Sequence, residues 1–178
     1  MGLFDFWGNS NYGSIAENMI TNKLMENEIK KLAKAGDFSK ITADISVLWP
    51  EFYEVEGFVL IRRPGSEKVN KAKAVKILDF ARDKSEYEWG CSEFRIQDYF
   101  DVESSTEGLK LAFIIADMWS CLFKREFPEY EFHIGIGCND GDTTIRYHRY
   151  REEEGTILVE DDLDGYKSEA IAVIVVSS

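Results

Sequence analysis

The sequence has few of the residues on which common catalytic and structural devices depend. It contains three cysteines and two histidines. The cysteines have an odd count and no Cys-x-x-Cys spacing, which argues against a disulfide framework and a cysteine zinc site. No Gly-x-Ser-x-Gly, phosphate-binding loop or dinucleotide-binding glycine pattern is present. We therefore predict no catalytic residue, no cofactor and no enzymatic activity.

Long apolar runs are missing as well. No segment approaches the roughly 20 apolar residues that a membrane-spanning helix needs. The first residues, among them Phe4, Phe6 and Trp7, lack the basic region and apolar stretch of a signal peptide. The sequence thus predicts a cytoplasmic protein that does not bind a membrane.

What the chain does contain is enough apolar material for one folded unit. Of its 178 residues, 44% are hydrophobic and 13% are aromatic, which suffices to bury a core at this length. No repeat, low-complexity tract or long linker interrupts the chain. Residues 1–178 are therefore expected to form a single domain.

Charge is distributed unevenly along the chain. The net charge is −12, with 13 basic and 12 acidic side chains in residues 1–84 but 8 basic and 21 acidic ones in residues 85–178. Nucleic acid is disfavoured as a direct ligand, because phosphate contacts need clustered Lys and Arg. An acidic surface raises the rate of association with a cationic partner. Solubility alone is the alternative explanation of the charge.

Hydrophobic periodicity, capping residues and chain breakers predict a mixture of helices and strands. Ser104 and Glu107 have the spacing of a capping box in front of the strongest amphipathic pattern. Helices are expected at residues 14–35, 39–48, 67–84 and 105–126. Strands are expected at residues 58–63, 87–89, 94–100, 130–138, 143–151, 156–159 and 170–176.

The clearest local pattern is a β-hairpin centred on Asp140-Gly141, residues preferred in a type I′ turn. The order of the elements predicts an α+β fold, with a mainly antiparallel sheet and helices on one side. A ferredoxin-like βαββαβ unit is expected, with an N-terminal helical extension and extra C-terminal strands. A two-residue hairpin loop predicts three facing pairs: Ile136 with Ile145, Ile134 with Tyr147, and His133 with His148.

One enzymatic alternative arises from the same hairpin. Residues 132–137, Phe-His-Ile-Gly-Ile-Gly, resemble the strand that precedes the turn in class III nucleotide cyclases. That resemblance implies a nucleotide-processing enzyme with a metal-binding carboxylate on its first strand, whereas residues 58–63 contain no carboxylate. The facing His133 and His148, with Glu131 one step along, form a second candidate metal site, although closed zinc sites need four ligands.

Seven carboxylates fall within residues 152–164, without the spacing of a calcium-binding EF-hand loop. They are expected either to form a solvated loop or to contact a basic partner surface. An open sheet edge offers a second route to a partner. The candidate contacts are Glu152, Glu153, Glu154, Glu160, Asp161, Asp162 and Asp164, with Tyr147, Tyr150 and Tyr166 as aromatic anchors.

Size, acidity, aromatic content and the missing catalytic motifs together resemble the immunity proteins of bacterial contact-dependent inhibition and related toxin systems. This resemblance is one of overall type across the whole chain and depends on no single motif. It implies stoichiometric binding to a cognate toxin domain, often a nuclease, and inhibition by occlusion. A basic protein partner is therefore expected.

Overall fold

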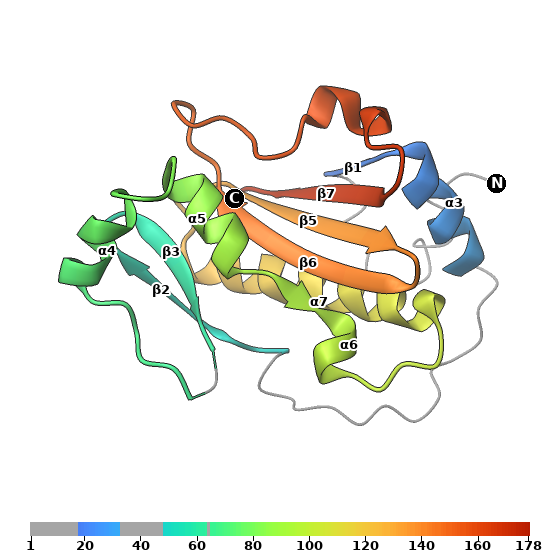
Figure 1. Cartoon of the computed structure of the whole chain (residues 1–178), viewed down its shortest axis with the longest axis horizontal. Coiled ribbons are helices and arrows are strands. Elements are labelled where there is room, and N and C mark those ends of the chain that lie inside the picture. Colours follow the sequence, from blue (N-terminus) through green and yellow to red (C-terminus); the bar gives the residue numbers. More distant parts are fainter. Residues whose placement is uncertain (1–17, 33–47, 64) are drawn as a thin grey trace.

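A computed structural model describes residues 18–32, 48–63 and 65–178, and the structural statements below refer to these residues. Its centre is a five-stranded sheet with the order β1-β7-β5-β6-β4, in which all neighbours are antiparallel (Figure 1). The expected α+β class with a mainly antiparallel sheet is confirmed. The strands are β1 Met19–Thr21, β4 Phe94–Arg95, β5 Phe132–Asn139, β6 Asp142–Arg149 and β7 Ala170–Val176.

The predicted hairpin is present as β5 and β6. Asp140 and Gly141 have φ angles of 47° and 93°, the left-handed geometry that a type I′ turn requires at both central positions. This turn fixes the register, so all three predicted pairs are observed. The apolar β7 lies between β1 and β5, inside the sheet, as its nearly continuous hydrophobic sequence indicates.

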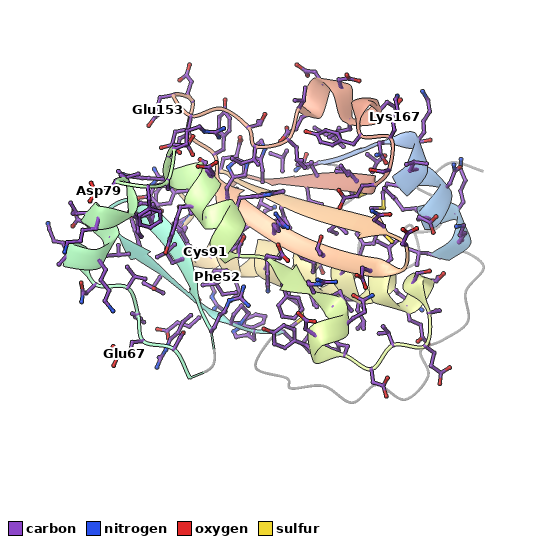
Figure 2. The ribbon with its side chains drawn as sticks, in the orientation of Figure 1. Phe52, Glu67, Asp79, Cys91, Glu153 and Lys167 are labelled. Atoms are coloured by element: carbon purple, nitrogen blue, oxygen red, sulfur yellow. The ribbon has the colours of Figure 1, made fainter. Side chains whose placement is uncertain are left out.

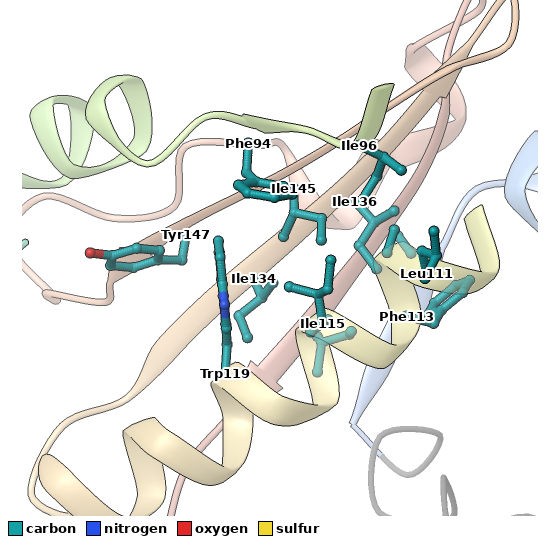
Figure 3. Close-up of a cluster of buried hydrophobic side chains, with 14 of the residues drawn as sticks. Phe94, Ile96, Leu111, Phe113, Ile115, Trp119, Ile134, Ile136, Ile145 and Tyr147 are labelled. Atoms are coloured by element: carbon teal, nitrogen blue, oxygen red, sulfur yellow. The ribbon is translucent and has the colours of Figure 1, made fainter. Parts of the chain in front are cut away.

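One face of the sheet packs against the long helix α7, Ser105–Glu126. The helix begins where expected because the Ser104 hydroxyl accepts a hydrogen bond from the Glu107 amide at 3.2 Å. Its inner side and the sheet share a buried cluster that includes Trp119, Ile134 and Tyr147 (Figure 3). This cluster is the main core of the protein.

The ferredoxin-like arrangement is not observed, because the first expected strand belongs to another sheet. Phe58–Arg62 (β3) pairs with Glu51–Val55 (β2) in a separate two-stranded sheet. A turn at Glu56-Gly57, with φ angles of 50° and 78°, connects these two strands. The prediction of a strand at residues 87–89 is also wrong, because these residues lie inside helix α5, Lys84–Cys91. The Asp83 side chain caps the first turn of this helix.

Several other boundaries differ from the expectations. Residues 19–21 are a strand because they pair with β7, and Asn22 then caps the helix α3, Lys23–Leu32. The helix expected at 67–84 is reduced to α4, Lys71–Ile77, and the strand expected at 94–100 to β4 and the short helix α6, Ile96–Tyr99. The helix expected at 39–48 lies almost entirely outside the described residues, as does the start of the one expected at 14–35.

The second face of the sheet is covered too, by α5 and by residues 152–169, which we call the covering segment. This segment contains the 3₁₀ helix η2, Glu160–Gly165, and runs alongside β7 (Figure 1). The prediction of a strand at residues 156–159 is wrong, because these residues form an irregular part of the covering segment. No helix within the described ranges is both long and apolar enough to cross a membrane.

Candidate functional site

The covering segment is fixed to the sheet by apolar side chains on its inner side. Leu158, Leu163 and Tyr166 pack against Ile171 and Val173 of β7. Burial of this small cluster holds the η2 part of the segment in place, so the carboxylates of η2 project from a supported surface, while those of residues 152–154 lie in a turn closed by the Arg151–Gly155 bridge. Among the described residues, four of these carboxylates are exposed and make no ion pair: Glu152, Glu153, Asp161 and Asp162.

The other three predicted carboxylates have internal partners. Glu154 accepts hydrogen bonds from the amide and hydroxyl of Ser85, at 2.8 and 2.6 Å, and so caps the start of α5. Glu160 bonds to His133, and Asp164 pairs with Lys23 at 2.7 Å. Glu154, Glu160 and Asp164 thus already have partners within the fold, which leaves the other four carboxylates as the candidate contacts that have no ion pair among the described residues.

The three predicted tyrosine anchors have different environments. Tyr147 is 1% exposed and donates a hydrogen bond to the Val59 carbonyl at 3.0 Å, so it is a core residue and not an anchor. Tyr150 is partly exposed and stacks on His133, with 5.1 Å between ring centroids. The Tyr166 hydroxyl accepts a hydrogen bond from the Val159 amide. Tyr150 and Tyr166 thus remain candidate contacts.

The two histidines lie side by side on the second face, with ring centroids 5.3 Å apart. Both ring nitrogens of His133 already have carboxylate partners, at 2.5 Å to Glu160 and 3.1 Å to Glu131. Within the part of the chain that the structure describes, no group of three His, Cys, Asp or Glu side chains has the arrangement of a metal site. The alternative of a His133, His148 and Glu131 site is thus not supported by the geometry.

The environments of the two histidines shift their pKa values in opposite directions. Burial lowers the pKa of His133, but its hydrogen bonds to Glu160 and Glu131 outweigh this effect and leave the pKa above its ordinary 6.5. Burial lowers the pKa of His148 to about 4. The surroundings of His133 therefore favour its cationic form more than water does, whereas His148 stays neutral at neutral pH.

We expect His148 to make the protein sensitive to acid. Between pH 6.5 and about 4 the unfolded chain binds a proton at this residue that the folded chain does not, so stability falls as the pH falls. The difference between the pKa of 6.5 in the unfolded chain and about 4 in the folded chain corresponds to a loss of roughly 3 kcal/mol in the free energy of unfolding. The test is urea unfolding of wild type and a His148→Gln variant across this pH range. The free energy of unfolding of the variant should fall less than that of wild type, by about the same amount.

The His133→Gln variant is the matched control for this pH profile. The contribution of the His133 ion pairs is complete below pH 6.5 and is lost as the pH rises through the raised pKa of the folded protein. That variant will therefore change the alkaline side of the profile and keep the acid side. Parallel profiles for wild type and His148→Gln between pH 4 and 6.5 would contradict the assignment.

A buried ion pair joins the two sheets to α5. The Glu88 side chain is 0% exposed and accepts four hydrogen bonds: two from Arg151, one from the Val59 amide and one from the Arg149 amide. Burial raises the pKa of Glu88, and Arg151 opposes that rise. Arg151 also donates to the Gly57 carbonyl at 2.7 Å. These two side chains are fully occupied by structural contacts.

The outer edge of β6 is closed by side chains, which bears on the expectation that an open sheet edge could accept a strand from a partner. The Thr143 amide donates to Gln97 at 3.1 Å. The Ser92 hydroxyl accepts from the Tyr147 amide and donates to its carbonyl, at 2.9 and 3.0 Å. Together with β4 at Ile145 and Glu88 at Arg149, these contacts leave no room for an added strand along β6.

The second face of the sheet contains a small cavity of about 180 Å³ that the sequence does not predict. It is lined by Gly135 and Gly137 of β5 together with Trp89, Arg146 and Glu169. A signal was available, since glycines inside a strand often mark the close approach of another group. The sequence does not reveal the cavity itself, because the large side chains near these glycines come from distant parts of the chain.

Comparisons with known proteins give a family and no activity. The chain matches no curated protein and no solved structure at a significant level. A family model matches residues 20–178, which is most of the chain. The chain therefore belongs to the family described as the uncharacterized protein PM0498 family.

Proposed function

We propose that this protein binds a basic protein partner through the outer side of its covering segment, and acts as a stoichiometric inhibitor of the immunity-protein type. The observation that carries the proposal is the group of four exposed carboxylates, Glu152, Glu153, Asp161 and Asp162, which have no ion-pair partner among the described residues. Seven acidic residues in this stretch account for much of the net charge of −12.

The position of these carboxylates supports binding. Leu163 is 4% exposed and, with Ile171 and Val173, anchors the segment from beneath. Charges held on a supported surface lose less conformational freedom on binding than charges on a free loop. A fixed negative surface also steers a cationic partner toward productive encounters.

The internal polar groups favour binding over catalysis. Glu88, Arg151 and His133 are buried ionisable groups near this face, and each is used in contacts between elements of the fold. A catalytic acid or base would need access to a substrate proton. The exposed carboxylates, by contrast, are available to a partner surface.

Neutralising the exposed carboxylates will slow association with the partner. Wild type immobilised at low salt should retain a basic protein from the source cell and release it as the salt concentration rises. With that protein purified, the four-fold variant should associate at least about ten times more slowly at low salt, with a flatter salt dependence. The variant carries Glu152→Gln, Glu153→Gln, Asp161→Asn and Asp162→Asn.

A control with the same change of net charge separates this surface from a general effect of acidity. Figure 2 shows Glu153 on the covering segment, far from Glu67 at the lower edge of the view. Equal slowing by both variants, or retention of the same proteins by wild type and the covering-segment variant, would contradict the proposal. The control variant carries Glu67→Gln, Asp79→Asn, Asp98→Asn and Asp101→Asn, all exposed carboxylates outside the segment.

A further inference from the structure

Two of the β5 positions that line the cavity on the second face, Gly135 and Gly137, have no side chain. A Cβ atom at Gly135 would lie 2.3 Å from the Trp89 ring, and one at Gly137 would lie 2.1 Å from a carboxylate oxygen of Glu169. Both distances are shorter than atoms tolerate. The glycines therefore let the Trp89 ring and the Glu169 carboxylate approach β5 closely.

The charges around this cavity do not cancel. Arg146 pairs with Glu93 and lies over the Trp89 ring, with its guanidinium carbon 5.9 Å from the ring centroid. The Glu169 carboxylate makes no hydrogen bond or ion pair with any residue in the described ranges. One negative charge is thus left uncompensated at the wall of a partly enclosed space, where a cation would be attracted.

The size of the cavity limits what can enter it. Its volume of about 180 Å³ holds several water molecules. It is smaller than the roughly 300 to 1,000 Å³ of sites for drug-sized ligands. Trp89, Leu158 and Ile171 supply apolar wall, while Thr144 and Glu169 supply oxygen atoms. This combination suits a short aliphatic chain that ends in a positively charged group.

We propose that this cavity binds a primary ammonium group on an aliphatic stem, with the ammonium on Glu169 and the stem against Trp89. The inference rests on the proposed function, since a lysine of the basic partner is the source we favour. Leu158 belongs both to the cavity wall and to the covering segment. A partner docked on the covering segment would therefore contact a segment that also borders the cavity.

The test uses n-butylammonium as the probe and amide NMR signals of the full chain as the readout. Titration should shift the signals of Gly135, Gly137 and the Trp89 indole N–H saturably, with a dissociation constant in the millimolar range typical of so small a ligand. The neutral n-butanol should bind at least about ten times more weakly, because it lacks the charge that Glu169 attracts. Absence of a saturable shift at these positions would overturn the proposal.

Two variants locate the binding group. Glu169→Gln should weaken n-butylammonium binding at least about ten-fold. Glu67→Gln removes the same charge from an exposed position outside the covering segment and should change the dissociation constant less than about two-fold. Unchanged binding in Glu169→Gln would refute the role of this carboxylate, and its NMR spectrum also reports whether the variant is folded.

The source of the ammonium group and the proposed function are tested separately. If Glu169→Gln also weakens binding of the purified basic partner, the cavity takes a side chain of that partner. Loss of n-butylammonium binding with unchanged partner affinity would instead assign the cavity to a free amine. The four-fold covering-segment variant keeps every residue of the cavity, so it should bind n-butylammonium normally whether or not it binds a partner.

Discussion

Replacing Arg151 with Met will lower the free energy of unfolding by about 3 to 5 kcal/mol, the range observed when one partner of a buried ion pair is removed. Glu88 has no exposed side-chain surface, so its carboxylate would lose its counter-charge without gaining water. The Gly57 carbonyl would lose its bond from Arg151 as well. Such a loss is a large part of the roughly 5 to 15 kcal/mol that stabilises a typical domain.

This effect is large because the pair joins three separate pieces of the fold. Glu88 lies on α5, its partner amides belong to Val59 of β3 and Arg149 of β6, and Arg151 follows β6. A substitution here weakens the contact of the two-stranded sheet with the main sheet. Urea unfolding followed by circular dichroism measures the change.

Arg95→Met is the matched control for the buried pair. Arg95 pairs with Asp142 at 2.6 Å, but the two side chains are 45% and 55% exposed. Exposed pairs of this kind contribute about 0 to 1 kcal/mol, so the free energy of unfolding of the control variant should be close to that of wild type. Similar losses in both variants would mean that Glu88 and Arg151 do not carry the stabilisation assigned to them.

Replacing Trp119 with Ala will lower the free energy of unfolding by a comparable amount, about 3 to 5 kcal/mol. The ring is 0% exposed and contacts Phe52, Phe94 and Tyr147 edge to face, at centroid distances of 5.7, 6.2 and 5.9 Å. Figure 3 shows it between α7 and the sheet. Truncation removes these contacts and leaves a cavity that the surrounding rings cannot fill.

Trp49 provides the comparison for this substitution, because it is 49% exposed and lies under Arg125 at 5.2 Å. Trp49→Ala removes the same atoms but should cost no more than about 1 kcal/mol. Thermal unfolding of the two variants beside wild type tests the difference. If Trp49→Ala is as destabilising as Trp119→Ala, the main core is not where we place it.

The candidate site shows where sequence reasoning reached its limit. The acidity of residues 152–164 is visible in the sequence, but the sequence does not reveal which carboxylates remain free. The sequence predicts Glu154 and Glu160 as partner contacts, whereas in the folded chain they bond to Ser85 and His133. Those partners are 69 and 27 residues away, beyond the range of any local pattern.

The sequence by itself determined the elements whose signals are local. Helix α7 follows from its Ser104 cap and apolar stripe, and the β5–β6 register follows from Asp140-Gly141, because a two-residue turn leaves one pairing for every following residue. The apolar strand β7 was equally plain. In each case the deciding interactions lie within a few residues or across a single turn.

Only the tertiary structure decided the rest. Residues 87–89 form a helix because Asp83 caps its first turn and because the helix places the Glu88 carboxylate against the Val59 amide of β3. Strand β3 pairs with β2 through a turn that the sequence analysis does not predict. The cavity over Gly135 likewise depends on Trp89 arriving from α5. These features arise from burial and pairing between distant segments, which outweigh local propensity once the chain is compact.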